Sequence, residues 1–262
     1  MGQICHMDEL RLRSRTVSEI VDAAFALYRR DSGQYILIMA VATIPQLVSR
    51  LVFRTDDTLS ATAIFVAFIT AITSAFTYTV GAAAVMKLGS EVYLGERADL
   101  GDTVRSVIPK VWALLWAGLM KAILYFIGFL AFIVGAFYVA ARFFAVGAAI
   151  VLEDKDVGEA FSRSSELSSG RKRHILNTML LVGIIYLLLS FCVSLVAGIT
   201  RSTVITIMFS TVFQIVAAPI IGLTDMLLYY DCRIRGEGFD IERMTASMDA
   251  GRVAPGTPGV AI

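Results

Sequence analysis

Long apolar blocks alternate with short polar segments along most of the chain. Several of these blocks reach the length of about 20 residues that an α-helix needs to cross a bilayer core of about 30 Å. In hydrocarbon the backbone N–H and C=O groups must bond within the segment, which a helix achieves. The pattern predicts an all-α polytopic membrane protein with six spans, at about 35–53, 60–86, 111–134, 136–152, 175–199 and 203–230.

The third and fourth spans belong to one unbroken apolar block. As a single helix, residues 111–152 would extend about 63 Å, roughly twice the bilayer core. The block must therefore fold back, and we expect the turn at Gly135-Ala136.

The basic residues test this count of spans. Most of the 23 Lys and Arg residues precede the first span, follow the last, or lie in the connections after the second and fourth spans. The opposite connections hold Arg54 and Arg201. Because basic loops stay in the cytoplasm, the pattern predicts that both termini are cytoplasmic. Merging the third and fourth spans would place the Arg171-Lys172-Arg173 cluster outside, so six spans fit better.

Composition supports this class of protein. The chain has 262 residues, of which 57% are hydrophobic and 17% are charged, and its mean hydropathy is +0.73. A soluble domain carries about 25% charged residues. Residues 1–244 are therefore expected to form a single membrane domain, and the Gly- and Pro-containing segment 245–262 is predicted to be a disordered cytoplasmic tail.

Three polar segments begin in the same way. Residues 16–19, 99–102 and 156–159 each have an N-cap residue, an aliphatic residue, a small residue and an acid. This order predicts the start of a helix, since the first side chain caps free N–H groups and the acid suits the helix dipole. We expect amphipathic elbow helices at the cytoplasmic membrane surface, each followed by two spans. The pattern indicates either three elbow-plus-hairpin units or the general need of any elbow helix for a cap.

The second span carries a small residue at every fourth position. Such a stripe lets helices approach closely and predicts packing within the chain, with an oligomer contact as the alternative. The stripe comprises Ala63, Ala67, Ala71, Ala75, Thr79 and Ala83.

Four charged residues lie within predicted spans, and one of them, Arg50, is near the outer end of the first span. Lys121 is near the middle of the third span, and Asp225 is about five residues from the inner end of the sixth. Arg142 is about six residues from the outer end of the fourth span, within reach of the outer surface. Intramembrane charges usually face a partner or a cavity. A Lys121–Asp225 pair would hold helices together, or these residues would form a site for an anionic headgroup or a solute.

Catalytic and cofactor motifs are missing from the sequence. It contains two histidines, His6 and His174, and no HExxH, GxSxG, P-loop or GxGxxG motif. Glu153, Asp154 and Asp156 are interpreted as solvated or capping acids. We therefore expect no enzyme, no metal or other cofactor and no nucleic-acid partner.

Three blocks of the sequence resemble one bacterial membrane-protein family. The first comprises residues 10–20 and 27–30, the second comprises residues 152–153 and 160–170, and the third is the Leu228–Asp240 block, LYYDCRIRGEGFD. The family is named for the membrane domain of glycerophosphoryl diester phosphodiesterases, and many members stand alone in the inner membrane. In fused relatives the phosphodiesterase chemistry belongs to a separate soluble barrel, whose residues this chain lacks.

The resemblance implies a membrane module with a charge network at its cytoplasmic edge. That network would brace the third elbow helix against the end of the last span. The residues that match the family blocks are Arg163, Glu166, Asp231, Arg233 and Arg235.

Two functions remain open from the sequence. The first is a non-enzymatic module that organises lipids, including anionic inner-leaflet lipids, or binds protein partners or a second copy. The alternative is a transporter or lipid-handling protein with an intramembrane site near Lys121 and Asp225. A polar cavity at Lys121 would favour the alternative.

Overall fold

The computed structural model describes residues 13–52, 61–96, 99–131, 133–200 and 202–239. Within these residues the chain is helical and has no strand, and six helical segments are long and apolar enough to cross a membrane. The protein is therefore an all-α polytopic membrane protein, as predicted. Arg54, Arg201 and the predicted tail lie outside the described residues.

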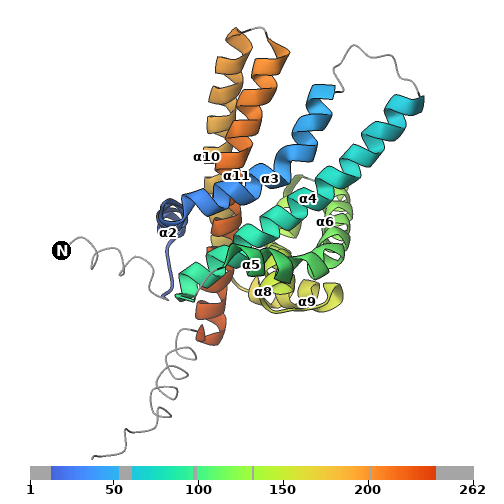
Figure 1. The fold of residues 1–262 in the computed structure, drawn as a ribbon. Helices are drawn as coiled ribbons and strands as arrows, with labels where there is room; N and C mark the ends of the chain where they lie inside the picture. Colours follow the sequence, from blue (N-terminus) through green and yellow to red (C-terminus); the bar gives the residue numbers. More distant parts are fainter. Residues whose placement is uncertain (1–12, 53–60, 97–98, 132, 201, 240–262) are drawn as a thin grey trace, which may run out of the picture.

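The order of helices repeats three times along the chain (Figure 1). Each time, a short elbow helix precedes a pair of longer helical segments. The first unit is α2 (Val17–Arg30), α3 (Ser32–Val52) and α4 (Ala61–Leu94); the second is α5 (Leu100–Val107), η1 (Ile108–Lys110), α6 (Val111–Ala131), α7 (Ile133–Arg142) and α8 (Val146–Leu152); the third is α9 (Val157–Leu167), α10 (Lys172–Ile199) and α11 (Thr203–Glu237).

The predicted caps begin all three elbow helices. Thr16 and Glu19 form a reciprocal capping box at α2. The Asp99 carboxylate accepts hydrogen bonds from the N–H groups of Gly101 and Asp102 at α5. The Asp156 carboxylate accepts one from the N–H of Glu159 at α9. These bonds satisfy N–H groups that have no partner within the helix.

Two spanning helices continue beyond their apolar blocks. Helix α4 ends at Leu94 and α11 at Glu237, although the predicted spans ended near residues 86 and 230. The added turns of α4 bury Leu88 and Tyr93, and Ser90 Oγ lies 2.6 Å from Tyr230 Oη of α11. Packing between the two helices, which hydropathy does not register, stabilises this extension.

The third and fourth spans differ from the predicted hairpin in where they turn and bend. The structure has Gly135 inside α7, so the chain folds back earlier than at Gly135-Ala136. A side chain at Gly128 or Gly135 would collide with the backbone of the other residue, so these glycines allow close approach of α6 and α7.

The fourth span is broken between Arg142 and Val146 and is not one helix. The hydroxyl of Ser164, on α9, donates to the carbonyl oxygen of Arg142 and accepts from the N–H of Ala145, both at 3.0 Å. This buried serine thereby satisfies backbone groups on both sides of the break.

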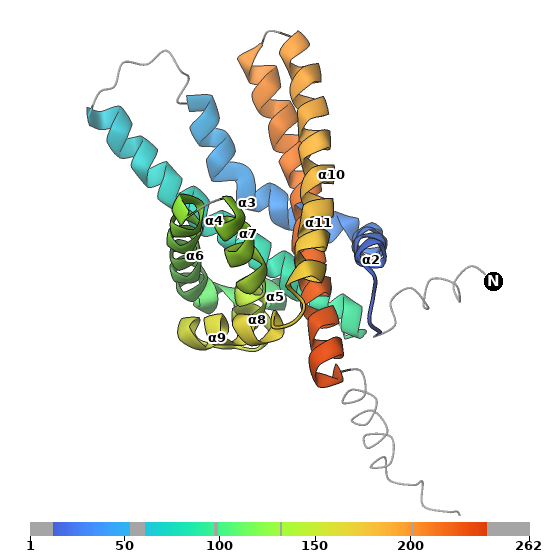
Figure 2. The same cartoon turned by 180° about the vertical axis from the view of Figure 1, so that it is seen from behind.

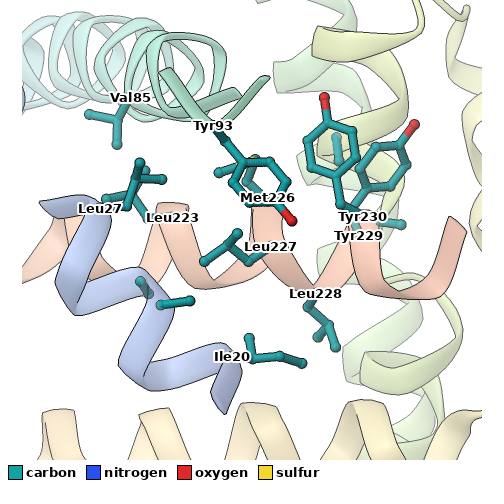
Figure 3. Close-up of a cluster of buried hydrophobic side chains, with 14 of the residues drawn as sticks. Ile20, Leu27, Val85, Tyr93, Leu223, Met226, Leu227, Leu228, Tyr229 and Tyr230 are labelled. Atoms are coloured by element: carbon teal, nitrogen blue, oxygen red, sulfur yellow. The ribbon is translucent and has the colours of Figure 1, made fainter. Parts of the chain in front are cut away.

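The main hydrophobic core surrounds the C-terminal half of α11. This helix contacts α2, α3, α4, α8, α9 and α10. Figure 3 shows Leu223, Leu227 and Leu228 of α11 in one cluster with Ile20 of α2 and Tyr93 of α4. The helix therefore joins elements from all three units.

The hairpins separate away from this core. Figures 1 and 2 show that the α3–α4 pair and the α10–α11 pair diverge from each other toward their connected ends. Large apolar side chains are exposed on all three pairs, including Phe68 on α4, Phe126 on α6 and Leu188 on α10. Ala67, Ala71 and Ala75 are also exposed, so the expected packing of the small-residue stripe within the chain is wrong for this part of α4.

Replacing Ser164 tests the capped break. Ser164→Ala should lower the free energy of unfolding by about 1–3 kcal/mol, because it leaves a buried carbonyl and a buried N–H without their partner. Unfolding in detergent micelles measures this loss. Ser190→Ala is the matched control, since Ser190 is half-exposed and its hydroxyl bonds within α10. Equal losses for the two variants would contradict this account of the break.

Candidate functional site

Charged side chains gather where the elbow helix α9 contacts the last turns of α11. Figure 2 shows these two parts of the chain at the same end of the molecule. We call this the basic end. It holds two clusters, which we name after their central carboxylates, Glu153 and Asp231.

The Glu153 cluster joins α8, α9 and α11. Glu153 follows α8 and accepts hydrogen bonds from Arg163 Nε and Arg163 Nη2 at 2.9 Å, one on each oxygen, as well as one from the Tyr229 hydroxyl. Arg163 also pairs with Glu237, and Arg233 Nε lies 3.1 Å from Glu237 Oε2 and 3.7 Å from Glu153 Oε1. Two carboxylates and two guanidinium groups therefore alternate across the contact of α9 with α11.

Electrostatics favours the ionised form of Glu153. Burial alone raises the pKa of this carboxyl, but hydrogen bonds from Arg163 and Tyr229, together with the nearby guanidinium charges, outweigh burial and lower its pKa. The Glu237 and Glu153 hydrogen bonds raise the pKa of Arg163 above its already high value. At neutral pH the cluster therefore holds full charges, fixed by bidentate geometry.

The Asp231 cluster ties the start of the described chain to its end. Asp231 is 1% exposed and accepts hydrogen bonds from the backbone N–H of Arg15 at 2.6 Å and from Arg235 Nε at 2.7 Å. His174 Nε2 of α10 lies 3.0 Å from Asp231 Oδ2, the oxygen that Arg235 also contacts, whereas Arg15 contacts Oδ1. Three segments distant in sequence thus converge on one buried carboxylate, which such partners must stabilise.

The five residues expected at this edge divide between the two clusters. Arg163 and Arg233 belong to the Glu153 cluster, whereas Asp231 and Arg235 belong to the other. Glu166 is 3.7 Å from Arg163, but its side chain is 76% exposed. The structure thus contains two networks where the sequence suggested one.

Sequence reasoning missed several members of these clusters. Glu153 was interpreted as a solvated or capping acid, but its side chain is 12% exposed. Tyr229 and Glu237 lay in the family block without an assigned role, and Arg15 and His174 were not linked to Asp231. Their contacts connect segments far apart in the chain, which spacing does not show.

The intramembrane residues do not form one site. Lys121 and Asp225 are near enough to interact electrostatically, but within the described chain they make no ion pair at 4.0 Å or less. Arg142 does not extend away from the elbow helices, as it would if it reached the outer surface as expected. Its Nε donates to Ser165 Oγ of α9 at 3.0 Å. The nearby polar partner on the elbow helix accounts for this direction.

Asp225 lies beside two cavities. One has a volume of about 290 Å³ and lies between α4, α6, α8 and α11, with Tyr78 and Thr79 as polar lining residues. The other, of about 170 Å³, lies between α10 and α11 and includes Thr178. Both linings are mostly apolar. The carboxylate is thus accessible within the helix bundle, and Lys121 lines neither cavity.

The described residues contain no group of three His, Cys, Asp or Glu side chains that could hold a metal ion. Comparisons with models of protein families, with curated proteins and with solved structures find no match to this chain. The site is therefore interpreted from its own geometry.

Double-mutant cycles test the division into two clusters. Arg163→Ala and Glu237→Ala should be non-additive by about 0.5–3 kcal/mol in the free energy of unfolding, because the two side chains contact each other. Arg163→Ala and Asp231→Ala should add within about 0.5 kcal/mol, because they act in separate clusters. Unfolding in detergent measures both cycles. Strong coupling between Arg163 and Asp231 would show that the basic end is one network.

Proposed function

We propose that this protein is a non-enzymatic membrane module that organises lipids or protein partners in the bacterial inner membrane, with both termini in the cytoplasm. The observation that carries this proposal is the unequal packing of its two ends. The three units meet in a dense, charged basic end, whereas the diverging parts of the hairpins expose large apolar side chains.

This shape suits a protein that presents surface to the bilayer. Side chains such as Phe68 and Leu188, which are 61% and 56% exposed, contact lipid chains or a partner helix in a membrane. Lipid chains are as apolar as leucine, so lipid and protein can exchange at such faces at little cost. Elbow helices α2 and α5 support the orientation, because the arginines in their last turns suit the anionic inner leaflet.

We also propose that the chain is a stand-alone relative of the family named for the membrane domain of glycerophosphoryl diester phosphodiesterases. The support is spatial. The three sequence blocks that carry the resemblance supply Arg15, Arg163 and Asp231, and all three blocks contribute to the basic end. They therefore form a shared structural centre, without the residues of the soluble phosphodiesterase barrel.

A transporter or lipid-handling role is the second candidate. Asp225 favours it, because a carboxylate between two intramembrane cavities is suited to bind a cation or a polar solute. The mostly apolar linings and the absence of Lys121 from them favour the first proposal.

Native mass spectrometry of protein extracted together with its surrounding lipids separates the two candidates. For the membrane module we expect bound lipid or a partner protein, retained equally by the wild type and by Asp225→Asn. For the lipid-handling role, Asp225→Asn would lose a specific lipid that Asp22→Asn, the control at an exposed position on α2, retains. A wild-type chain that carries neither lipid nor partner would contradict the membrane-module proposal.

A further inference from the structure

A basic cleft lies at the basic end, between the start of α10 and the end of α11. Its volume is about 960 Å³, within the range of sites that bind small molecules. The described residues that line it include no acid. They are Arg13, Ser14, Gly170, Arg171, Arg173, His174, Ile234, Arg235 and Gly238.

Two of these arginines keep an uncompensated charge. Arg171 donates to the carbonyl oxygens of Arg235, at 2.9 Å, and Leu167, at 3.4 Å. Carbonyl groups orient a guanidinium group but do not neutralise it. Arg173 is exposed, and in the described chain no carboxylate lies within 4.0 Å of it. Both positive charges therefore remain available to an anion.

The other basic residues of the cleft have partners outside its lining. Arg235 and His174 share the buried Asp231, and Arg13 Nη2 lies 2.8 Å from Glu19. These contacts fix side chains at the wall of the cleft. The arrangement is preorganised, so a ligand would not have to order several long side chains.

The first turn of α10 adds a favourable dipole. Its N-cap residue, Arg171, makes no side-chain capping bond, unlike the caps of the three elbow helices. Gly170, Arg171, Arg173 and His174 all line the cleft at this point. The N–H groups of a helix's first turn attract anions, so they reinforce the guanidinium charges.

We propose that this cleft binds a phosphate group, carried by an anionic lipid headgroup or by a soluble phosphate compound. Phosphate oxygens match the paired N–H donors of arginine and, through their charge, the otherwise unneutralised Arg171 and Arg173. The lipid source deepens and rests on the proposed function, since it places the cleft at the membrane surface. The soluble source is independent of it.

Isothermal titration of the full-length protein in a non-ionic detergent tests the proposal. The probes are inorganic phosphate and dihexanoyl phosphatidic acid, with dihexanoyl phosphatidylcholine as the control lipid of equal chain length. Wild-type protein should bind at least one of the two phosphate probes, at least ten times more tightly than it binds the zwitterionic control. Binding of inorganic phosphate indicates a soluble source, and binding of phosphatidic acid alone indicates a headgroup.

Arg173→Gln identifies the site. This variant should bind about ten times more weakly, because it loses one charge-assisted contact, and Arg173→Lys should recover part of the loss. Arg173 is exposed, so both variants should melt as the wild type does. Arg29→Gln, at the exposed end of α2 and outside the cleft, is the matched control and should bind normally.

Two results would overturn the proposal: no binding of either phosphate probe by the wild type, or equal affinity for wild type and Arg173→Gln. The second result, obtained with lipid still retained in native mass spectrometry, would leave the proposed function intact. Conversely, phosphate binding that depends on Arg173, in a protein that retains neither lipid nor partner, would support the cleft and contradict the proposed function.

Discussion

Two partly or fully buried carboxylates, Glu153 and Asp231, determine how the three helical units meet. A carboxylate removed from water is strongly unfavourable without charged or hydrogen-bonding partners. Glu153 takes these partners from α9 and α11, and Asp231 takes them from α10, α11 and the segment before α2. The partners come from different parts of the chain, so satisfying the two carboxylates also helps to fix the positions of elbow helices α2 and α9.

This requirement explains the contrast between the two ends of the molecule. At the basic end, polar contacts between elements lie next to apolar side chains such as Leu227 and Tyr229, which are almost fully buried around α11 (Figure 3). Toward the opposite end, the polar contacts between hairpin helices are few among the described residues and involve no charged group; they include the bonds from Gln214 to Gln46 and from the Thr77 hydroxyl to the Ala42 carbonyl oxygen. Apolar side chains there gain little by packing on one another when lipid is the solvent. The basic end is therefore fixed by charged contacts, and the diverging hairpins present apolar side chains on their surface.

The sequence predicted the parts of this fold that depend on local chemistry. Apolar length indicated six spans, and the caps at Thr16, Asp99 and Asp156 marked the start of each elbow helix. The break after Arg142 was not predictable, because no proline or glycine marks it and its hydrogen bonds come from Ser164 on another helix. The predicted spans that correspond to α4 and α11 were too short for a similar reason, because packing extends these two helices past their apolar blocks.

The candidate sites show the same limit. Arg163 and Asp231 stood out through the family resemblance, but their assignment to separate clusters depends on tertiary contacts. The basic cleft was equally hidden, because its lining joins residues 13–14, 170–174 and 234–238. A count of charges by segment identified the basic face of the membrane protein but not the place where uncompensated arginines converge.

Quenching of tryptophan fluorescence by lipids with brominated chains tests most directly whether the diverging hairpins face the bilayer. Both native tryptophans would first be replaced, as Trp112→Phe and Trp116→Phe, and one tryptophan introduced at a time. The account predicts strong quenching for Phe68→Trp and Leu188→Trp and weak quenching for Phe144→Trp, whose site is 7% exposed. Quenching at positions 68 and 188 as weak as at position 144 would contradict it, because protein would then cover these faces.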